Sequence, residues 1–262
     1  MYTIATLEDL RRHLQLSEDD SGSDDDLMRA LQGASHLIES TTQRRYCPRI
    51  ETLELTADRS APGTLILPDD LLELRSISDD GGAIDLAEVS LQPGRGDEPA
   101  GILQLEPGAA FRFGLSPISM VSVGGVWGWH DRWSRAWRDS GDPVGDQALS
   151  AHATLIGVAD GAGADEDGAR PRFQVGHMLR IDGEYLRVTA VDGTANRLTV
   201  LRGVAGTRAT AHLRGTTIET YAPAPTIRDL TVRYAELMLK SVGPIELDSR
   251  PLLERLRRLT AS

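Results

Sequence analysis

The second half of the chain is organised around one stretch, HMLRIDGEYLRVT at His177–Thr189. Two alternating runs of apolar and polar residues flank its Asp182-Gly183 pair, and this arrangement is a strong short-range signal for a β-hairpin. A second pair, Asp192-Gly193, separates the following strand from Leu198–Leu201. We therefore expect residues 148–221 to form a β-unit of their own.

Strand and turn signals also fill the chain upstream of this β-unit, from Ile50 to Val126. Thr52–Thr56 and Leu74–Ser78 alternate between apolar and polar residues, and the second run leads into Asp80-Gly81-Gly82. Short runs separated by turn residues are typical of antiparallel sheets. An antiparallel β layer is therefore predicted, and Gly141-Asp142-Pro143 marks the boundary that follows it.

Helical patterns lie toward both ends of the chain. Thr6–Leu14 predicts a short helix capped by Thr6, and Asp24–Arg45 predicts a longer helix with an apolar stripe. Ile227–Ser241 presents one apolar face, and a last short helix is expected over Leu252–Leu259. The predicted fold class is α+β, and three segments are expected: 1–147 with helices and a β layer, 148–221 with the β-module, and 222–262 with the C-terminal helices.

Composition excludes several classes of protein. The chain of 262 residues has 28 Lys plus Arg against 39 Asp plus Glu, which gives a formal charge of -11 at pH 7 and argues against general nucleic-acid binding. A single cysteine, Cys47, excludes an intramolecular disulfide and a cysteine-based zinc site. No run approaches the ~18 apolar residues of a membrane span, and no signal peptide is recognisable. We expect a soluble, intracellular product without a membrane partner.

No catalytic residue, metal site or cofactor is expected. The six histidines are scattered, none forms the i, i+4 pair of a helical metal site, and structural roles are predicted for them. The chain lacks the nucleophile-elbow, P-loop and dinucleotide-binding motifs. The acidic runs at 17–26 and 160–167 lack the ligand order of a calcium loop and are expected to be solvated. A hydrolase assembled from distant Ser and His residues is the remaining enzymatic alternative.

All four tryptophans fall in one short stretch, at Trp127, Trp129, Trp133 and Trp137, with arginines between them. Aromatic rings with interleaved Arg can stack on sugars or bases. Trp and Arg are also enriched at the centres of protein interfaces. We favour packing in a core or a subunit interface, because an acidic chain lacks the attraction for phosphate that a nucleic-acid platform needs.

A family resemblance rests on four patterns: the two N-terminal helices with their IESTTQRR ending at Ile38–Arg45, the run from Leu65-Ile66-Leu67-Pro68 to Leu74–Ser78, the turn GVWGWH at Gly125–His130, and the helix Ile227–Ser241. Together they resemble the head–tail connector (adaptor) proteins of long-tailed bacteriophages. The unit His177–Ile218, with RIDGEYLRVT and RGVAGT, is similar to a β-module that recurs in phage neck and tail proteins.

The resemblance implies a helical adaptor core with an antiparallel β layer and an inserted small β-barrel-like or β-sandwich-like module. It implies a structural virion protein at the neck, made in the host cytoplasm, that forms a twelve-fold ring beneath the portal protein. Further implied partners are a stopper or tail-completion protein and the DNA that passes through the channel without tight binding. No enzymatic activity and no cofactor are implied.

The candidate site residues form three groups. Portal docking is expected from the closing helices, through Ile227, Leu230, Tyr234, Leu237, Leu253, Arg255, Leu256, Arg257 and Arg258. The lumen candidates are Asp24, Asp25 and Asp26, because an acidic wall keeps the duplex mobile, and the β-module at 148–221 is the alternative lining. Trp127, Trp129, Trp133 and Trp137 are the core or interface candidates. The alternative function is a β-rich carbohydrate-binding or adhesion module that uses these tryptophans as a sugar platform.

Overall fold

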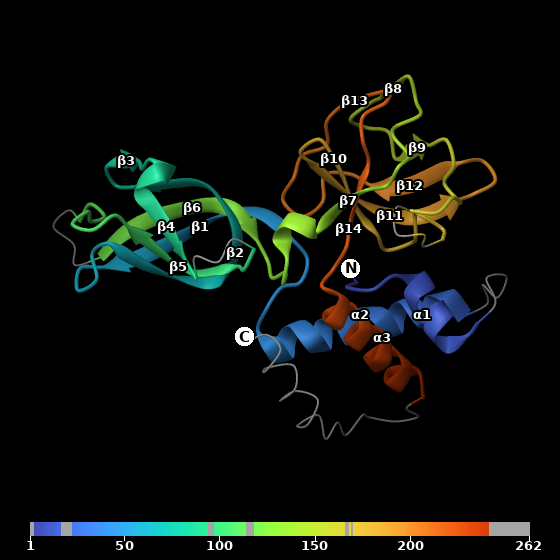
Figure 1. Ribbon diagram of the computed structural model, residues 1–262, viewed down its shortest axis with the longest axis horizontal. Coiled ribbons are helices and arrows are strands. Elements are labelled where there is room, and N and C mark those ends of the chain that lie inside the picture. Colours follow the sequence, from blue (N-terminus) through green and yellow to red (C-terminus); the bar gives the residue numbers. More distant parts are fainter. Residues whose placement is uncertain are drawn as a thin grey trace. The chain divides into compact units, whose positions relative to one another are not determined.

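The structure, a computed structural model, describes residues 3–16, 23–93, 97–113, 118–165, 168 and 170–240 (Figure 1). These residues divide into two units. The central unit is Arg44–Arg135, and the terminal unit combines the described residues of Met1–Gln43 and Ala136–Ser262. Each unit contains a six-stranded sheet in which every pairing is antiparallel.

The sheet of the central unit has the strand order β1-β6-β2-β5-β4, and β3 pairs with β2. Its elements are β1 (Arg49–Asp58), β2 (Thr64–Asp79), β3 (Gly82–Ala83), η2 (Leu86–Glu88), β4 (Val89–Gln92), β5 (Ala100–Leu105), β6 (Ile118–Trp127) and η3 (Trp133–Arg135). The long strand β2 pairs with β5 through its first half and with β6 through its second half. This one strand therefore joins the two halves of the sheet.

The core of the central unit is built from strand residues and from Phe111. Its buried members are Ala57, Leu65, Leu67, Leu71, Ile77, Ala100, Leu103, Leu105, Phe111, Val121, Val123 and Trp127. Gly125 lies inside β6, where β2 shifts its register. A Cβ at Gly125 would lie 2.4 Å from the carbonyl oxygen of Glu73 and 2.7 Å from Cδ1 of Leu71, so the close packing of the two strands requires glycine there.

The sheet of the terminal unit has the order β7-β14-β10-β11-β12-β9, and β13 and β8 form a separate two-stranded pair. Its strands are β7 (Trp137–Asp139), β8 (Ala148–Leu149), β9 (Leu155–Gly157), β10 (Met178–Ile181), β11 (Glu184–Asp192), β12 (Arg197–Leu201), β13 (His212–Leu213) and β14 (Glu219–Tyr221). The hairpin predicted at Asp182-Gly183 is confirmed, with Asp182 at a φ of 53°. The second predicted hairpin joins β11 to β12.

Three helices complete the terminal unit: α1 (Leu7–Leu14), α2 (Asp24–Thr42) and α3 (Pro225–Lys240), and each contacts the other two. The predicted cap of α1 is confirmed, because the Thr6 hydroxyl accepts from the backbone N–H of Asp9 and the Asp9 carboxylate accepts from that of Thr6. Helix α2 ends at Thr42, so Arg44 and Arg45 lie beyond it. A Cβ at Gly33 would lie 2.9 Å from Sδ of Met238, which shows how closely α2 and α3 approach.

The predicted fold class, an α+β protein with a helical adaptor core and an inserted small β-module, is wrong. The described part of the chain is mostly β, with three helices beside two six-stranded sheets and a two-stranded one. The physical reason lies in the cores: both sheets bury an extensive apolar cluster of their own. Strands, and not the helical ends, therefore organise most of the buried surface.

The expected division into 1–147, 148–221 and 222–262, in which the last segment completes the adaptor core of the first, stays a prediction. The sheet of the terminal unit begins at Trp137, before residue 148, because β7 pairs with β14. The last expected helix, Leu252–Leu259, lies outside the described residues. Within the described ranges, no helix combines the length and the apolar character needed to cross a membrane.

Trp127 provides a test of the central core. Its side chain is fully buried, and its indole N–H donates to the carbonyl oxygen of Glu51 at 3.0 Å. We expect Trp127→Ala to lower the free energy of unfolding by about 3–5 kcal/mol, as measured by urea denaturation. Trp133→Ala is the control. Trp133 is half-buried, so its removal should lower the free energy of unfolding by less. Equal losses in the two variants would contradict the assignment of Trp127 to the core.

Candidate functional site: a polar pocket and a buried ionic network

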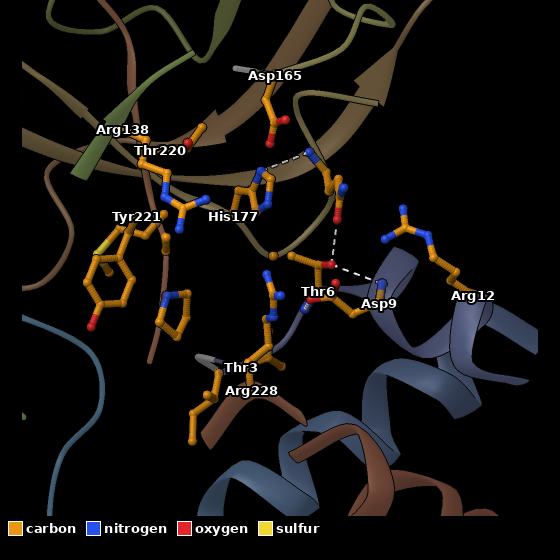
Figure 2. A pocket seen from close by; sticks show the side chains of 16 residues that line it. Thr3, Thr6, Asp9, Arg12, Arg138, Asp165, His177, Thr220, Tyr221 and Arg228 are labelled. Carbon is orange, nitrogen blue, oxygen red and sulfur yellow. Dashed lines mark hydrogen bonds between the residues drawn. The ribbon is translucent and has the colours of Figure 1, made fainter. Parts of the chain in front are cut away.

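A polar pocket of about 180 Å³ lies within the terminal unit (Figure 2). The start of α1, the segment before β10, the strand β14 and the start of α3 contribute its walls. Thr6, Asp9, His177, Thr220 and Arg228 are among the side chains that line it. The pocket therefore brings residues from both ends of the chain to one place.

Contacts between α1 and the segment before β10 hold this pocket in shape. The Thr6 hydroxyl donates to Oε1 of Gln174 at 2.5 Å, and the backbone N–H of Leu7 donates to the carbonyl oxygen of Val175 at 3.4 Å. The side-chain amide of Gln174 also donates to the carbonyl oxygen of Pro171 at 3.1 Å. Gln174 is thus fixed from two sides, and its own backbone N–H in turn orients His177.

His177 is the principal titratable group of the pocket. Its Nδ1 accepts a hydrogen bond from the backbone N–H of Gln174 at 3.2 Å, so the proton of the neutral ring lies on Nε2. Burial lowers the pKa of His177 to about 4; Asp9 and Asp165 oppose this effect, and the positive charge of Arg228 adds to it. The ring is therefore a neutral hydrogen-bond donor at pH 7.

This protonation state limits the chemistry of the pocket. A general base needs a free lone pair aimed at the group it deprotonates. The lone pair on Nδ1 of His177 is already used by a backbone N–H, and Nε2 carries the proton. No cluster of three metal-ligating side chains occurs among the described residues. The arrangement is suited to binding a ligand that accepts hydrogen bonds.

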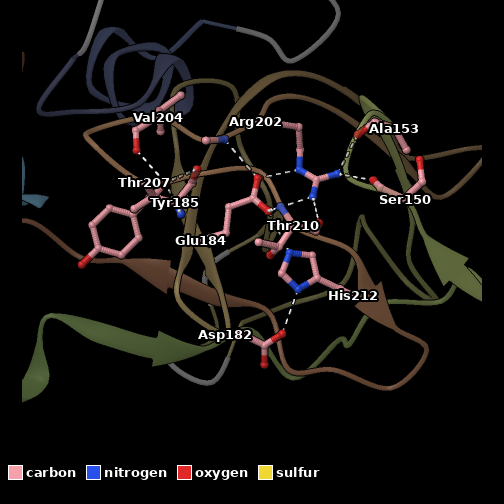
Figure 3. Close-up of polar contacts among 11 residues, drawn as sticks. Ser150, Ala153, Asp182, Glu184, Tyr185, Arg202, Val204, Thr207, Thr210 and His212 are labelled. Carbon is pink, nitrogen blue, oxygen red and sulfur yellow. Dashed lines mark hydrogen bonds and ion pairs between the residues drawn. The ribbon is translucent and has the colours of Figure 1, made fainter.

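A second polar site lies around Glu184, at the start of β11 (Figure 3). The side chain of Glu184 is fully buried and pairs with Arg202 through two hydrogen bonds of 2.7 and 2.8 Å. Its carboxylate also accepts from the backbone N–H groups of Gly203 at 3.0 Å and Thr210 at 2.9 Å. Nε2 of His212 lies 2.9 Å from the same carboxylate. A buried charge is stable only when it is compensated in this way.

Arg202 and His212 extend this network to neighbouring loops. Arg202 donates to the carbonyl oxygens of Ser150, Ala153 and Thr210 at 2.6–2.9 Å. Nδ1 of His212 lies 2.8 Å from Oδ2 of Asp182. Both ring nitrogens of His212 are therefore engaged by carboxylates. The network is therefore a structural clamp that ties the segment 202–212 to the hairpin.

The hydrogen bonds of the clamp dominate the acidity of Glu184. Burial by itself raises the pKa of this carboxyl, but the bonds from Arg202, the Thr210 N–H and His212 outweigh it and lower the pKa to about 2. The group is thus ionised at every pH at which the protein is expected to work. The ionised Glu184 carboxylate therefore balances the positive charge of Arg202, whose side chain is 5% exposed.

The structure does not bring the four tryptophans together in one unit. Trp127 is buried in the central core, and Trp129 packs edge-on against Tyr46, 5.5 Å between ring centroids. Trp133 lies in η3 and is half-buried. Trp137 begins β7 in the terminal unit and contacts Tyr185 and Tyr221, and the Arg180 guanidinium lies 4.6 Å from its ring centroid.

The described docking candidates have different environments on α3. Ile227 and Tyr234 are buried, Leu230 is half-buried, and Leu237 is 46% exposed. The remaining candidates, Leu253, Arg255, Leu256, Arg257 and Arg258, lie outside the described residues. Ile227 and Tyr234 thus contribute to the fold of the terminal unit, and Leu237 is the described candidate with the most exposed side chain.

The acidic lumen candidates begin α2. Asp24 pairs with Arg11 of α1, and Asp26 pairs with Arg29 one turn further along α2. Asp25 and Asp26 are exposed. At the N-terminus of a helix these charges also complement the helix dipole. The pairing of Asp24 gives it a structural role in joining two helices, whatever surface the other two residues face.

Neither the pocket nor the clamp was predicted from the sequence. Arg202 and His212 follow Glu184 by 18 and 28 residues, so no local spacing reveals that they meet. The available signal is Glu184, a charged residue directly after the Asp182-Gly183 turn. The alternating pattern places this position on the buried face of the strand. For His177, the prediction of a structural histidine missed the pocket beside it.

Comparisons with known proteins add no assignment. No protein-family model matches the chain, and no curated protein is significantly similar to it.

The clamp predicts a large effect of one conservative substitution. Glu184→Gln removes the charge that compensates buried Arg202, and we expect a loss of about 3–5 kcal/mol in the free energy of unfolding. The control is Glu73→Gln, because Glu73 pairs with Arg75 on the surface and its loss should cost less than about 1 kcal/mol. Urea denaturation at pH 7 measures both. A loss at Glu184 no larger than at Glu73 would contradict the clamp.

The lowered pKa of His177 predicts acid sensitivity. Between pH 6.5 and about 4 the unfolded chain binds a proton at this residue that the folded protein resists, so stability is complete above pH 6.5 and declines as the pH falls. We expect His177→Gln to flatten this part of the stability profile, measured by denaturation at several pH values. The same slope in wild type and variant would show that another group is responsible.

Proposed function

We propose that the chain is a structural virion protein, a head–tail connector that forms a ring beneath the portal, joins capsid to tail and lines the DNA channel. The observation that carries the proposal is the contact of α1 and α2 with α3 in the terminal unit. These are the helices on which the resemblance to phage connectors rests, and they meet although about 180 residues separate α2 from α3. The function is non-enzymatic.

The character of α3 supports a docking role. Its buried face, with Ile227, Tyr234 and Ala235, holds it in the terminal unit. Toward its end, Leu237 and Leu239 are 46% and 36% exposed. Residues two positions apart on a helix do not share a face, so Leu237, the more exposed of the two, is the side chain available to a partner. The proposed partner for this end of α3 is the portal protein.

The charge of the chain supports the proposed relation to DNA. A formal charge of -11 per chain would be multiplied in a ring. Affinity for DNA grows with every phosphate that a basic residue neutralises, and an acidic channel avoids such contacts. DNA would therefore pass through the ring without tight binding.

The carbohydrate-binding alternative has less support. A sugar platform requires aromatic faces that are open to solvent. Trp127 is fully buried, and Trp129 and Trp137 each pack against tyrosine rings. Glycan binding by the purified protein, in the absence of a ring, would favour this alternative.

The proposal is tested by particle mass. We expect native mass spectrometry to find a ring, alone or with the portal protein, and electron microscopy to show its central channel. Leu237→Asp should reduce co-purification with the portal while leaving the circular dichroism spectrum unchanged, because the side chain is largely exposed. Arg233→Ala, on the same helix and 66% exposed, is the matched control. A particle that stays monomeric with and without the portal contradicts the proposal.

A further inference from the structure

Three hydrogen-bond donors face the polar pocket without a partner in the described part of the chain. The Thr3 hydroxyl is buried, with the residue 4% exposed, and it makes no hydrogen bond. Nε2–H of His177 points away from the one bond that its ring makes, to the Gln174 N–H. The Arg228 guanidinium forms no ion pair among the described residues. A buried donor without an acceptor costs free energy, and this penalty applies to the Thr3 hydroxyl. Arg228 is exposed, so its guanidinium is available to a ligand without such a penalty.

The same side chains are close in space and come from separate elements. Figure 2 shows the Arg228 side chain reaching from the start of α3 toward the His177 ring, and its charge lowers the pKa of that ring. Thr3 precedes α1 and lies beside Gly176, where a Cβ would be 3.1 Å from the Thr3 hydroxyl oxygen. Gly176, at a φ of +98°, thus allows its backbone to lie close to the Thr3 hydroxyl.

We propose that this pocket is a binding site for a carboxylate group, held by Arg228, His177 and Thr3. A carboxylate carries one negative charge and accepts hydrogen bonds only, which matches a guanidinium and two neutral donors. The pocket of about 180 Å³ holds roughly six water volumes, enough for a carboxylate with a few attached carbon atoms. The proposal is independent of the connector function.

The pocket lining carries charges of both signs, with Asp9 and Asp165 beside Arg12, Arg138 and Arg228. Asp9 and Asp165 both line the wall and act on His177. Asp9 is engaged by the cap of α1, where it accepts from the Thr6 N–H at 3.1 Å. Their negative charges reduce the attraction for any anion, and most for phosphate, which carries more than one negative charge at pH 7. A singly charged carboxylate is repelled less.

The carboxylate has two sources, a small carboxylic acid or the side chain of an acidic peptide segment. The experiment therefore uses sodium acetate as one probe and an acetylated, amidated Gly-Glu-Gly peptide as the other. Titrations of the ¹⁵N-labelled full chain are followed by NMR, with sodium chloride matched in ionic strength. Tighter binding of acetate indicates a small acid, and tighter binding of the peptide, against a Gly-Gln-Gly control, indicates a partner protein.

We expect acetate to shift the amide signals of Gly176 and His177 and to bind more tightly than inorganic phosphate. Arg228→Gln should weaken acetate binding about tenfold, because it removes the charged donor. Arg233→Gln is the matched control, since Arg233 lies on the same helix and pairs with Asp229 outside the pocket lining. No shift beyond that caused by chloride, tighter binding of phosphate, or equal affinity in the two variants would overturn the proposal.

Discussion

The terminal unit depends on keeping one carboxylate, that of Glu184, charged and out of water. A desolvated charge is destabilising unless donors surround it, and here Arg202, His212 and two backbone N–H groups supply them. The consequence is that the segment after β12 cannot adopt an arbitrary path. It must return to the start of β11, and after that return β13 pairs with β8 and β14 pairs with β10.

Local signals predicted local structure well. Asp182-Gly183 identified its hairpin because a residue at positive φ joins two short strands, and Thr6 identified the start of α1 because its hydroxyl satisfies a free backbone N–H. Contacts between distant residues were not predictable in this way. Trp127 and Trp137 are near in sequence but belong to different units, since the chain leaves the central sheet between them.

The prediction of the proportion of helix and sheet was wrong for a related reason. The apolar stripes of α2 and α3 are long and regular, so a prediction from hydrophobic periodicity gives the helices too much weight. The strands are short, and β2 changes partners along its length, which no alternation pattern reveals. For the pocket, the decisive residues Thr3, His177 and Arg228 come from three separate segments, and none carries a recognisable motif.

The interruption of the terminal unit by Arg44–Arg135 has a consequence for synthesis on the ribosome. Helix α2 emerges early, with Leu31 and Ile38 destined for burial, but α3 is made about 180 residues later. At typical elongation rates that delay is on the order of ten seconds or more. The central sheet is complete long before then, so it can fold while the apolar stripe of α2 still awaits its partner. A nascent chain of this kind offers chaperones a defined early target, the exposed face of α2.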